Sequence, residues 1–207
     1  SGEAVHQFLK DRGLFKWYSS LRCATQELVW QSVLRAVESD PVSVAQIGEP
    51  EAPRHGGSLT LDNAISLPDY VDKMDVHLMP GNYQGGHSNG AEAGVIYDNG
   101  LDVFSFGMMG ENLDDIGHSM ANFTRLKWPD FDPSLIVDVG CTIGHNTLPW
   151  KQAFPDAEVH GLDAAAPCLR YGHARAEALG VEIHFRQALC DALPYEDNSV
   201  DVVFSSM

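Results

Sequence analysis

The sequence is poor in cysteine and in basic residues, and each shortage excludes a class of function. Its four cysteines, Cys23, Cys141, Cys168 and Cys190, form no Cys-x-x-Cys pair, so a metal knuckle or a redox dithiol of that spacing is excluded. We expect all four to be buried free thiols. Lys and Arg total 13 against 29 Asp and Glu, which gives a formal net charge of −16 at pH 7. Because this charge repels phosphate backbones and anionic lipids, we expect a small molecule or another protein as the partner, and neither nucleic acid nor a membrane.

Long apolar runs and an export signal are also missing. No run approaches the roughly 18 apolar residues that a membrane span needs, and no basic stretch followed by an apolar one opens the sequence. With unpaired cysteines, this pattern favours a cytoplasmic protein. The first two residues, Ser1-Gly2, resemble the remnant of a cleaved purification tag and carry no functional argument. At 207 residues, with 44% apolar and 20% charged residues, the composition indicates one globular domain with an additional cap.

The amino-terminal segment predicts one long helix. Apolar residues recur every three or four positions from Leu14 to about Ser39, a spacing typical of an amphipathic helix. We expect Trp17 and Trp30 to lie in the core.

The following segment predicts an irregular cap. Residues 41–110 carry many prolines and glycines, so little regular structure is expected there. Two stretches, Val76–Tyr83 and Tyr97–Met109, are nevertheless too apolar for a solvated linker, and we interpret them as packed parts of the cap. We therefore expect residues 1–110 to form a helical and loop-rich cap, and residues 111–207 to form the main domain.

After Pro133 the sequence alternates between short apolar runs and helical segments. Strands are predicted over residues 135–139, 158–162, 182–186 and 200–205, and helices over 112–127, 166–179 and from a glycine turn to 154. We expect Asn112 to cap the first helix and Gly180 to close the last. Such alternation implies right-handed crossovers and an α/β fold with a parallel sheet.

A glycine turn and a later acid mark the candidate binding site. Gly140 and Gly144 lie where the first of these strands turns into a helix, and Asp163 ends the next strand. A carboxylate at that place can accept both hydroxyl hydrogens of a ribose. A nicotinamide dinucleotide needs Gly-x-Gly-x-x-Gly for its pyrophosphate, but here Thr142 and His145 occupy the second and third glycine positions. The cationic cofactor S-adenosylmethionine carries no phosphate and tolerates side chains in this loop, so the sequence favours it.

Three segments in this order resemble successive motifs of the class I S-adenosylmethionine-dependent methyltransferases. They are Asp138-x-Gly140-x-Thr142-x-Gly144, then Gly161-x-Asp163, then the run from Asp191 to Val203. The resemblance covers residues 112–207 and implies a Rossmann-like parallel sheet that binds S-adenosyl-L-methionine.

The resemblance also implies a role for each site residue. The methionine part would be held by Asp138, Gly140, Cys141, Thr142 and Gly144, the ribose by Asp163 with Ala164, and the adenine by Leu189, Cys190 and Asp191. Two positions depart from the family pattern. Thr142 replaces the middle glycine, and Leu189 stands where an acid is usual, with Asp191 displaced by two. Backbone amides near Cys190 are therefore an alternative adenine contact.

The function that this resemblance implies is methyl transfer to a small-molecule acceptor. A non-catalytic methyltransferase-like binding module is the alternative, favoured by Thr142 and Leu189. No catalytic base is assigned. His145 suits either a role near the substrate or helix capping, and the cap residues Tyr83, His87 and Tyr97 suit packing more than substrate contact. Nine histidines without paired carboxylates give no metal signature.

The family sheet has seven strands, of which the sequence predicts four. A fourth strand at the edge would expose unpaired backbone groups beside the cofactor site. We therefore expect either that the chain is a fragment of a longer product, or that another chain or a swapped element, as in a homo-oligomer, completes the sheet.

Overall fold

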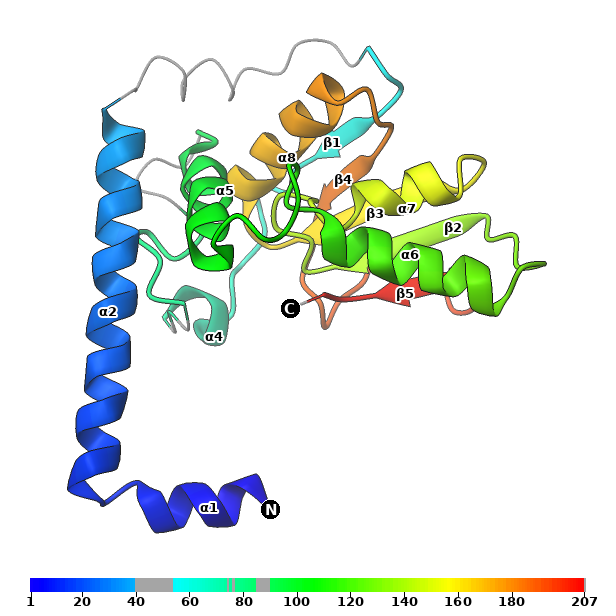
Figure 1. Ribbon diagram of the computed structural model, residues 1–207. Helices are drawn as coiled ribbons and strands as arrows, with labels where there is room; N and C mark the ends of the chain where they lie inside the picture. The colour runs from blue at the N-terminus through cyan, green and yellow to red at the C-terminus, as the bar shows by residue number, and fades with distance from the viewer. Residues whose placement is uncertain (40–53, 74, 76, 85–89, 207) are drawn as a thin grey trace.

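A parallel five-stranded sheet forms the centre of the molecule in the computed structural model, which describes residues 1–39, 54–73, 75, 77–84 and 90–206 (Figure 1). The strand order is β1-β4-β3-β2-β5, and every pair is parallel. The strands are β1 (Ser58–Thr60), β2 (Leu135–Val139), β3 (Glu158–Asp163), β4 (His184–Gln187) and β5 (Val202–Phe204). The predicted α/β, Rossmann-like sheet is confirmed, with β4 and β5 each beginning two residues later than expected.

Three helices cover one face of this sheet. They are α6 (Asp115–Lys127), α7 (Leu148–Ala153) and α8 (Ala166–Ala178). Side chains alternate between the two faces of a strand, so Ile136, Val159 and Phe185 point to the same side. There they pack in one core with Trp150 of α7 and Leu169 of α8. This apolar face holds α7 and α8 against the strands.

A second core joins the amino-terminal part to the sheet. Helix α2 (Gly13–Glu38) contributes Trp30 and Val33, and helix α5 (Glu92–Ser105) contributes Ile96. Both pack beside Cys168 of α8, and α5 lies between α2 and α8 (Figure 1). The expectation of little regular structure in residues 41–110 is wrong for the 14 residues of α5 and for β1. The short helix α4 (Asp69–Asp72) completes this part. The domain division at residue 110 stays a prediction, although β1 lies in the same sheet as the later strands.

Helix α2 has the predicted extent but only half of the predicted burial. Trp30 is 4% exposed, as expected for a core residue, whereas Trp17 is 62% exposed and its predicted core position is wrong. Leu14 and Leu21 are exposed as well. The reason is geometric: α5 packs against the second half of α2, while the first half and α1 (Gly2–Leu9) extend away from the sheet (Figure 1). None of the helices among the described residues has the length and apolar character needed to cross a bilayer.

Four smaller expectations need correction. Cys141 and Cys168 are buried free thiols, but Cys23 and Cys190 are exposed. Helix α6 begins at Asp115 behind Asp114, and no side chain caps it, so the predicted cap at Asn112 is wrong. Phe106 and Met108, predicted as packed, are exposed where the chain leaves α5. Val76, in the other predicted packed stretch, lies outside the described residues.

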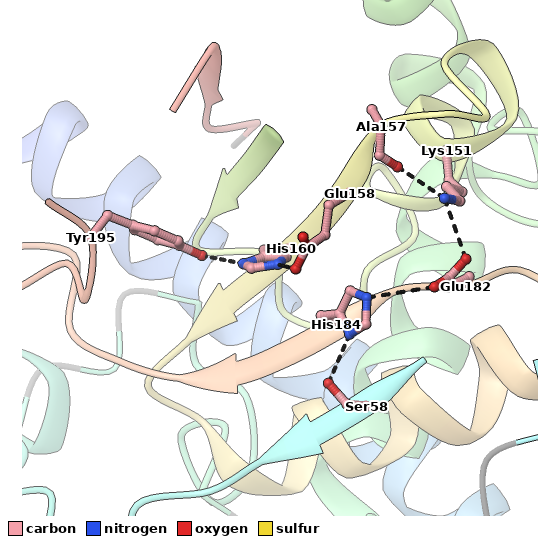
Figure 2. A network of polar contacts seen from close by, with 8 residues as sticks. All are labelled: Ser58, Lys151, Ala157, Glu158, His160, Glu182, His184 and Tyr195. Atoms are coloured by element: carbon pink, nitrogen blue, oxygen red, sulfur yellow. Dashed lines mark hydrogen bonds and ion pairs between the residues drawn. The ribbon is translucent and has the colours of Figure 1, made fainter. Parts of the chain in front are cut away.

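A polar network crosses the face of the sheet opposite the helices (Figure 2). His160 and His184 are register partners on β3 and β4, with ring centroids 5.4 Å apart. His160 contacts the Tyr195 hydroxyl at 2.6 Å and the Glu158 carboxylate at 2.6 Å. His184 contacts the Ser58 hydroxyl at 2.9 Å. The network therefore ties β1 and the segment before β5 to the two central strands.

Candidate active site

Two glycines in the loop after β2 have different surroundings: Gly140 faces open space, and Gly144 packs against Phe185. Gly140 has φ +79°, and a Cβ placed there would meet nothing nearer than the Ser205 hydroxyl at 4.0 Å. Gly144 has φ +73°, but a Cβ there would come within 2.7 Å of the Phe185 ring. Both positions need glycine for the backbone conformation. Gly140 alone faces open space, and Gly144 serves the packing beneath the loop.

Asp163 fixes this loop to the end of β3. Its Oδ2 accepts the Thr142 amide hydrogen at 2.9 Å, and its Oδ1 accepts that of Ala165 at 2.8 Å. Thr142 itself has a left-handed φ of +49°, which the bond to Asp163 helps to hold. Burial raises the pKa of Asp163, while the backbone hydrogen bonds from Ala165 and Thr142 act in the opposite direction. The Ala164 amide is a third backbone donor to this carboxylate, and a carboxylate has about four acceptor positions, so about one remains for a ligand.

Asp138 is buried in the centre of the sheet. Its Oδ2 accepts the Thr147 hydroxyl hydrogen at 2.6 Å, whereas its Oδ1 is buried without a hydrogen-bond partner in the described structure. Burial raises the pKa of Asp138 to about 7, the Thr147 hydrogen bond lowers it, and the charge of Asp163 raises it further. Near neutral pH this carboxyl is therefore poised between its neutral and charged forms.

A cavity of about 500 Å³ lies in front of the loop. Small-molecule sites typically range from about 300 to 1,000 Å³. The ends of β2 and β3 form one wall, α5 and α2 form a second, and the segment before α5 forms a third. The lining residues are Gln26, Trp30, Val71, His77, Asn82, Tyr83, Gln84, Tyr97, Leu101, Phe104, Gly140, Thr142, Asp163, Ala164 and Ala165.

The wall opposite the sheet is mainly aromatic. The Tyr83 and Tyr97 rings are 5.7 Å apart, and those of Trp30 and Phe104 are 5.0 Å apart. The Trp30 indole nitrogen donates to the His77 carbonyl at 2.7 Å, which anchors that segment to α2. Burial raises the pKa of Tyr97, while a hydrogen bond with the Thr142 side chain lowers it. The cavity thus joins a polar end at the sheet to an apolar end beneath α2 and α5.

The structure brings together part of the predicted site. Gly140, Thr142, Asp163 and Ala164 line the cavity. The other predicted residues do not line the cavity. Three of them are buried, namely Asp138, Cys141 and Gly144. In the segment after β4, Leu189 is half-buried and Cys190 and Asp191 are exposed.

The cap lines part of the cavity with residues that the sequence analysis named and with others that it did not. Tyr83 and Tyr97, for which packing was favoured, line the cavity, and His87 lies outside the described residues. His145 is buried beside Tyr97 and caps no helix, because the residue before α7 is Thr147 and makes no side-chain cap. Sequence reasoning missed His77, Gln26 and Phe104. Only the apolar stretch from residue 76 to 83 gave a signal for that region.

Metal ligation has no support in the part of the chain that the structure describes. No group of three or more His, Cys, Asp or Glu residues there is arranged to hold an ion.

Comparison with known proteins finds a match for the carboxyl-terminal segment, which forms most of the sheet. Residues 136–207 match a family model described as a methyltransferase domain. The demethylmenaquinone methyltransferase of Thermus thermophilus is 39% identical over 71 residues, 34% of this chain and 32% of that protein. The malonyl-[acyl-carrier protein] O-methyltransferase of Methylococcus capsulatus is 32% identical over 96 residues, 45% of this chain and 33% of that protein.

Among solved structures, coclaurine N-methyltransferase bound to N-methylheliamine and SAH overlaps 91% of this chain and 55% of its own, at 11% identity and a TM-score of 0.45. The chain spans about a third of the length of the two curated relatives above. The matched motifs are those that build the loop after β2 and end β3. The segment from residue 136 to residue 207 is therefore similar to methyltransferase domains in sequence.

Proposed function

We propose that this chain binds S-adenosylmethionine across the carboxyl ends of β2 and β3 and transfers its methyl group to a small molecule held in the aromatic part of the cavity. One observation carries the proposal: Gly140 and Asp163 line the same cavity as the aromatic side chains of the cap. In doubly wound sheets, ligands bind outside the carboxyl ends of the strands.

The polar end of the cavity suits the nucleoside. Asp163 accepts backbone hydrogens from Thr142, Ala165 and Ala164, so about one of its four acceptor positions remains for a ribose hydroxyl. The open space at Gly140 admits the ligand to the backbone. The Ala188 amide donates to the Asp163 carbonyl at 3.0 Å, so the segment that follows β4 starts beside the proposed ribose position. We assign the adenine to that segment, which contains Leu189, Cys190 and Asp191.

Two aromatic rings and one carboxyl group can stabilise the positive charge of the cofactor. The faces of Tyr83 and Tyr97 can attract a cation in the cavity. Asp138 carries a buried oxygen without a partner directly behind the loop, and we assign it to the electrostatics of the methionine part. When bound, S-adenosylmethionine supplies an activated methyl group on positively charged sulfur. The protein's part is then to align the acceptor in line with that methyl group and to exclude water.

The acceptor class follows from charge and cavity size. A net charge of −16 disfavours nucleic acid, and a cavity of about 500 Å³ suits a small metabolite. The names of the curated relatives point to a quinone precursor in one case and a carrier-bound acid in the other, so they agree on methyl transfer but not on one acceptor. Buried Cys141 and Cys168 fit a reducing cytoplasm as the place of the reaction.

Calorimetric titration with S-adenosylmethionine and S-adenosylhomocysteine tests this proposal. We expect saturable binding of both compounds and none of a nicotinamide dinucleotide. Asp163→Ala removes a charged acceptor and should weaken both affinities about tenfold or more. Asp130→Ala, at an exposed acid between α6 and β2 that does not line the cavity, is the matched control. Absence of heat with a folded sample would exclude the cofactor assignment, and equal affinities of the two variants would exclude the ribose contact.

A further inference from the structure

The cavity holds a pair of side chains that the nucleoside site does not use. The Tyr83 hydroxyl lies 2.5 Å from the His77 Nδ1, and both residues line the cavity. Their rings meet edge to face with centroids 5.7 Å apart. A hydroxyl and an imidazole in contact, at the wall facing Asp163, form a group that can exchange protons with a ligand.

The pair is held in place from three sides. The His77 carbonyl accepts hydrogens from Trp30 at 2.7 Å and from Gln26 at 2.6 Å, both on α2. The Tyr83 ring packs on Tyr97 of α5, and the Tyr83 carbonyl accepts from the Cys168 thiol of α8 at 3.8 Å. These anchors use backbone groups and ring faces. The hydroxyl and the imidazole are therefore not used as anchors, and they contact each other.

Tyr83 and His77 differ in exposure, and this difference defines the direction in which a proton would leave the cavity. Tyr83 is half-buried and His77 is exposed. Burial raises the pKa of Tyr83 well above its usual range, and so do Tyr97, Cys168, Asp163 and Asp75 around it. The hydroxyl therefore stays protonated, and it donates to His77 Nδ1 in the tautomer whose proton is on Nε2. A proton received inside the cavity can leave through His77 to water.

The lining also limits the acceptor. Among the described residues, no Lys or Arg lines the cavity, and Asp163 is its only carboxylate. An anionic acceptor would find no cationic side chain in this lining, whereas a neutral one loses little on burial. The rings of Trp30, Phe104 and Tyr97 favour a planar aromatic compound.

We propose that His77 and Tyr83 deprotonate a neutral aromatic hydroxyl compound, which is the methyl acceptor of this site; the inference rests on the proposed function. The acceptor hydroxyl gives its proton to the Tyr83 oxygen as Tyr83 passes its own proton to His77 Nδ1. The acceptor oxygen forms a bond to the methyl carbon, the carbon–sulfur bond breaks, and its electron pair stays on sulfur. The products are an aryl methyl ether, a neutral thioether and a His77 imidazolium, which releases its proton to water.

The experiment uses 4-nitrophenol, whose ionised form is yellow and whose neutral form is not. The full chain is titrated with this probe from pH 5 to 9, with and without S-adenosylhomocysteine, and absorbance reports its ionisation. We expect the apparent pKa of the bound probe to fall by about one unit, a tenfold gain in the phenolate form. His77→Gln and Tyr83→Phe should abolish this shift, while His6→Gln on exposed α1 should retain it.

Each other outcome of the titration counts against one specific part of the proposal. The His77 side chain makes none of the bonds to α2, so His77→Gln should fold and bind S-adenosylhomocysteine like the wild type, which calorimetry checks. Failure of the wild type to bind S-adenosylhomocysteine counts against the proposed function, not against the pair. Failure to bind the probe overturns the acceptor class. Binding with no shift, or with the same shift in His77→Gln, overturns the role of the pair.

Discussion

Two carboxyl groups on neighbouring strands, Asp138 and Asp163, differ in how many hydrogen bonds their oxygens accept. Both oxygens of Asp163 accept backbone hydrogens, whereas one oxygen of Asp138 has no partner. An unsatisfied buried charge is costly, so Asp138 resists ionisation. Its pKa of about 7 means that its charge state changes near neutral pH.

The stability of the protein should therefore depend on pH through Asp138. Between its ordinary pKa of 3.8 and about 7, the unfolded chain ionises this carboxyl while the folded chain keeps its proton. This contribution is fully present below pH 3.8 and is lost as pH rises toward 7, by on the order of 4 kcal/mol. Asp138→Asn does not titrate and should not show the loss. Urea unfolding at pH 4, 5.5 and 7 measures both, and parallel pH profiles would contradict the prediction.

Sequence spacing located the polar half of the site but not the aromatic half. The distance from Gly140 to Asp163 follows from one strand-helix-strand unit, whose geometry is regular, so the two residues could be expected at one edge. The placement of His77 and Tyr83 depends on an irregular segment and on its bonds to Trp30. No periodicity encodes such a contact, and the sequence could not supply it.

Helix α5 shows how packing decides the structure of a glycine-rich segment. It contains Gly94 and Gly100, which weaken a helix in isolation. Each gives room to an aromatic ring: a Cβ at Gly94 would approach Tyr171 to 2.3 Å, and one at Gly100 would approach Trp30 to 2.1 Å. Composition favoured an irregular cap here because propensity ignores such tertiary contacts. The strands and α8, with regular apolar spacing, were predicted well.

Gly100→Ala tests this packing directly. The added methyl group would overlap the Trp30 ring, so either α2 moves from α5 or the ring turns into the cavity. We expect a loss of about 1–3 kcal/mol in the free energy of unfolding, measured by urea. Val103→Ala, at an exposed position of the same helix, should change it by no more than about 0.5 kcal/mol. Equal stability of the glycine variant and the wild type would show that α2 and α5 do not pack as described.

At the scale of the whole molecule, the cavity lies between the two cores. Loops after β2 and β3 form one wall of the cavity, while α2 and α5 form another. The parallel sheet of β4, β3, β2 and β5 could be predicted from alternating strands and helices, but crossover handedness does not fix the order of these strands. The position of β1 could not, because three residues show no periodicity.

A ligand that contacts both walls should stabilise the entire fold. Binding to the folded state alone adds about 2.7 kcal/mol at a ligand concentration 100 times Kd. For a chain of this size we expect S-adenosylmethionine to raise Tm by about 5–10 °C. Scanning calorimetry or fluorescence gives the shift, and Asp163→Ala at the same ligand concentration should show a smaller one. An unchanged Tm at saturating ligand would argue against a site that bridges the two parts.

The edge strand β1 pairs with a strand that is synthesised much later, and this affects the order of folding. Its neighbour is β4, and the bond between Ser58 and His184 joins residues 126 positions apart. During synthesis, β1 emerges long before β4 and has no strand to pair with until β4 has been made. Contacts of such long range slow folding, since a large loop must close before they form. The amino-terminal third should consequently be the last part to become resistant to protease in a refolding reaction.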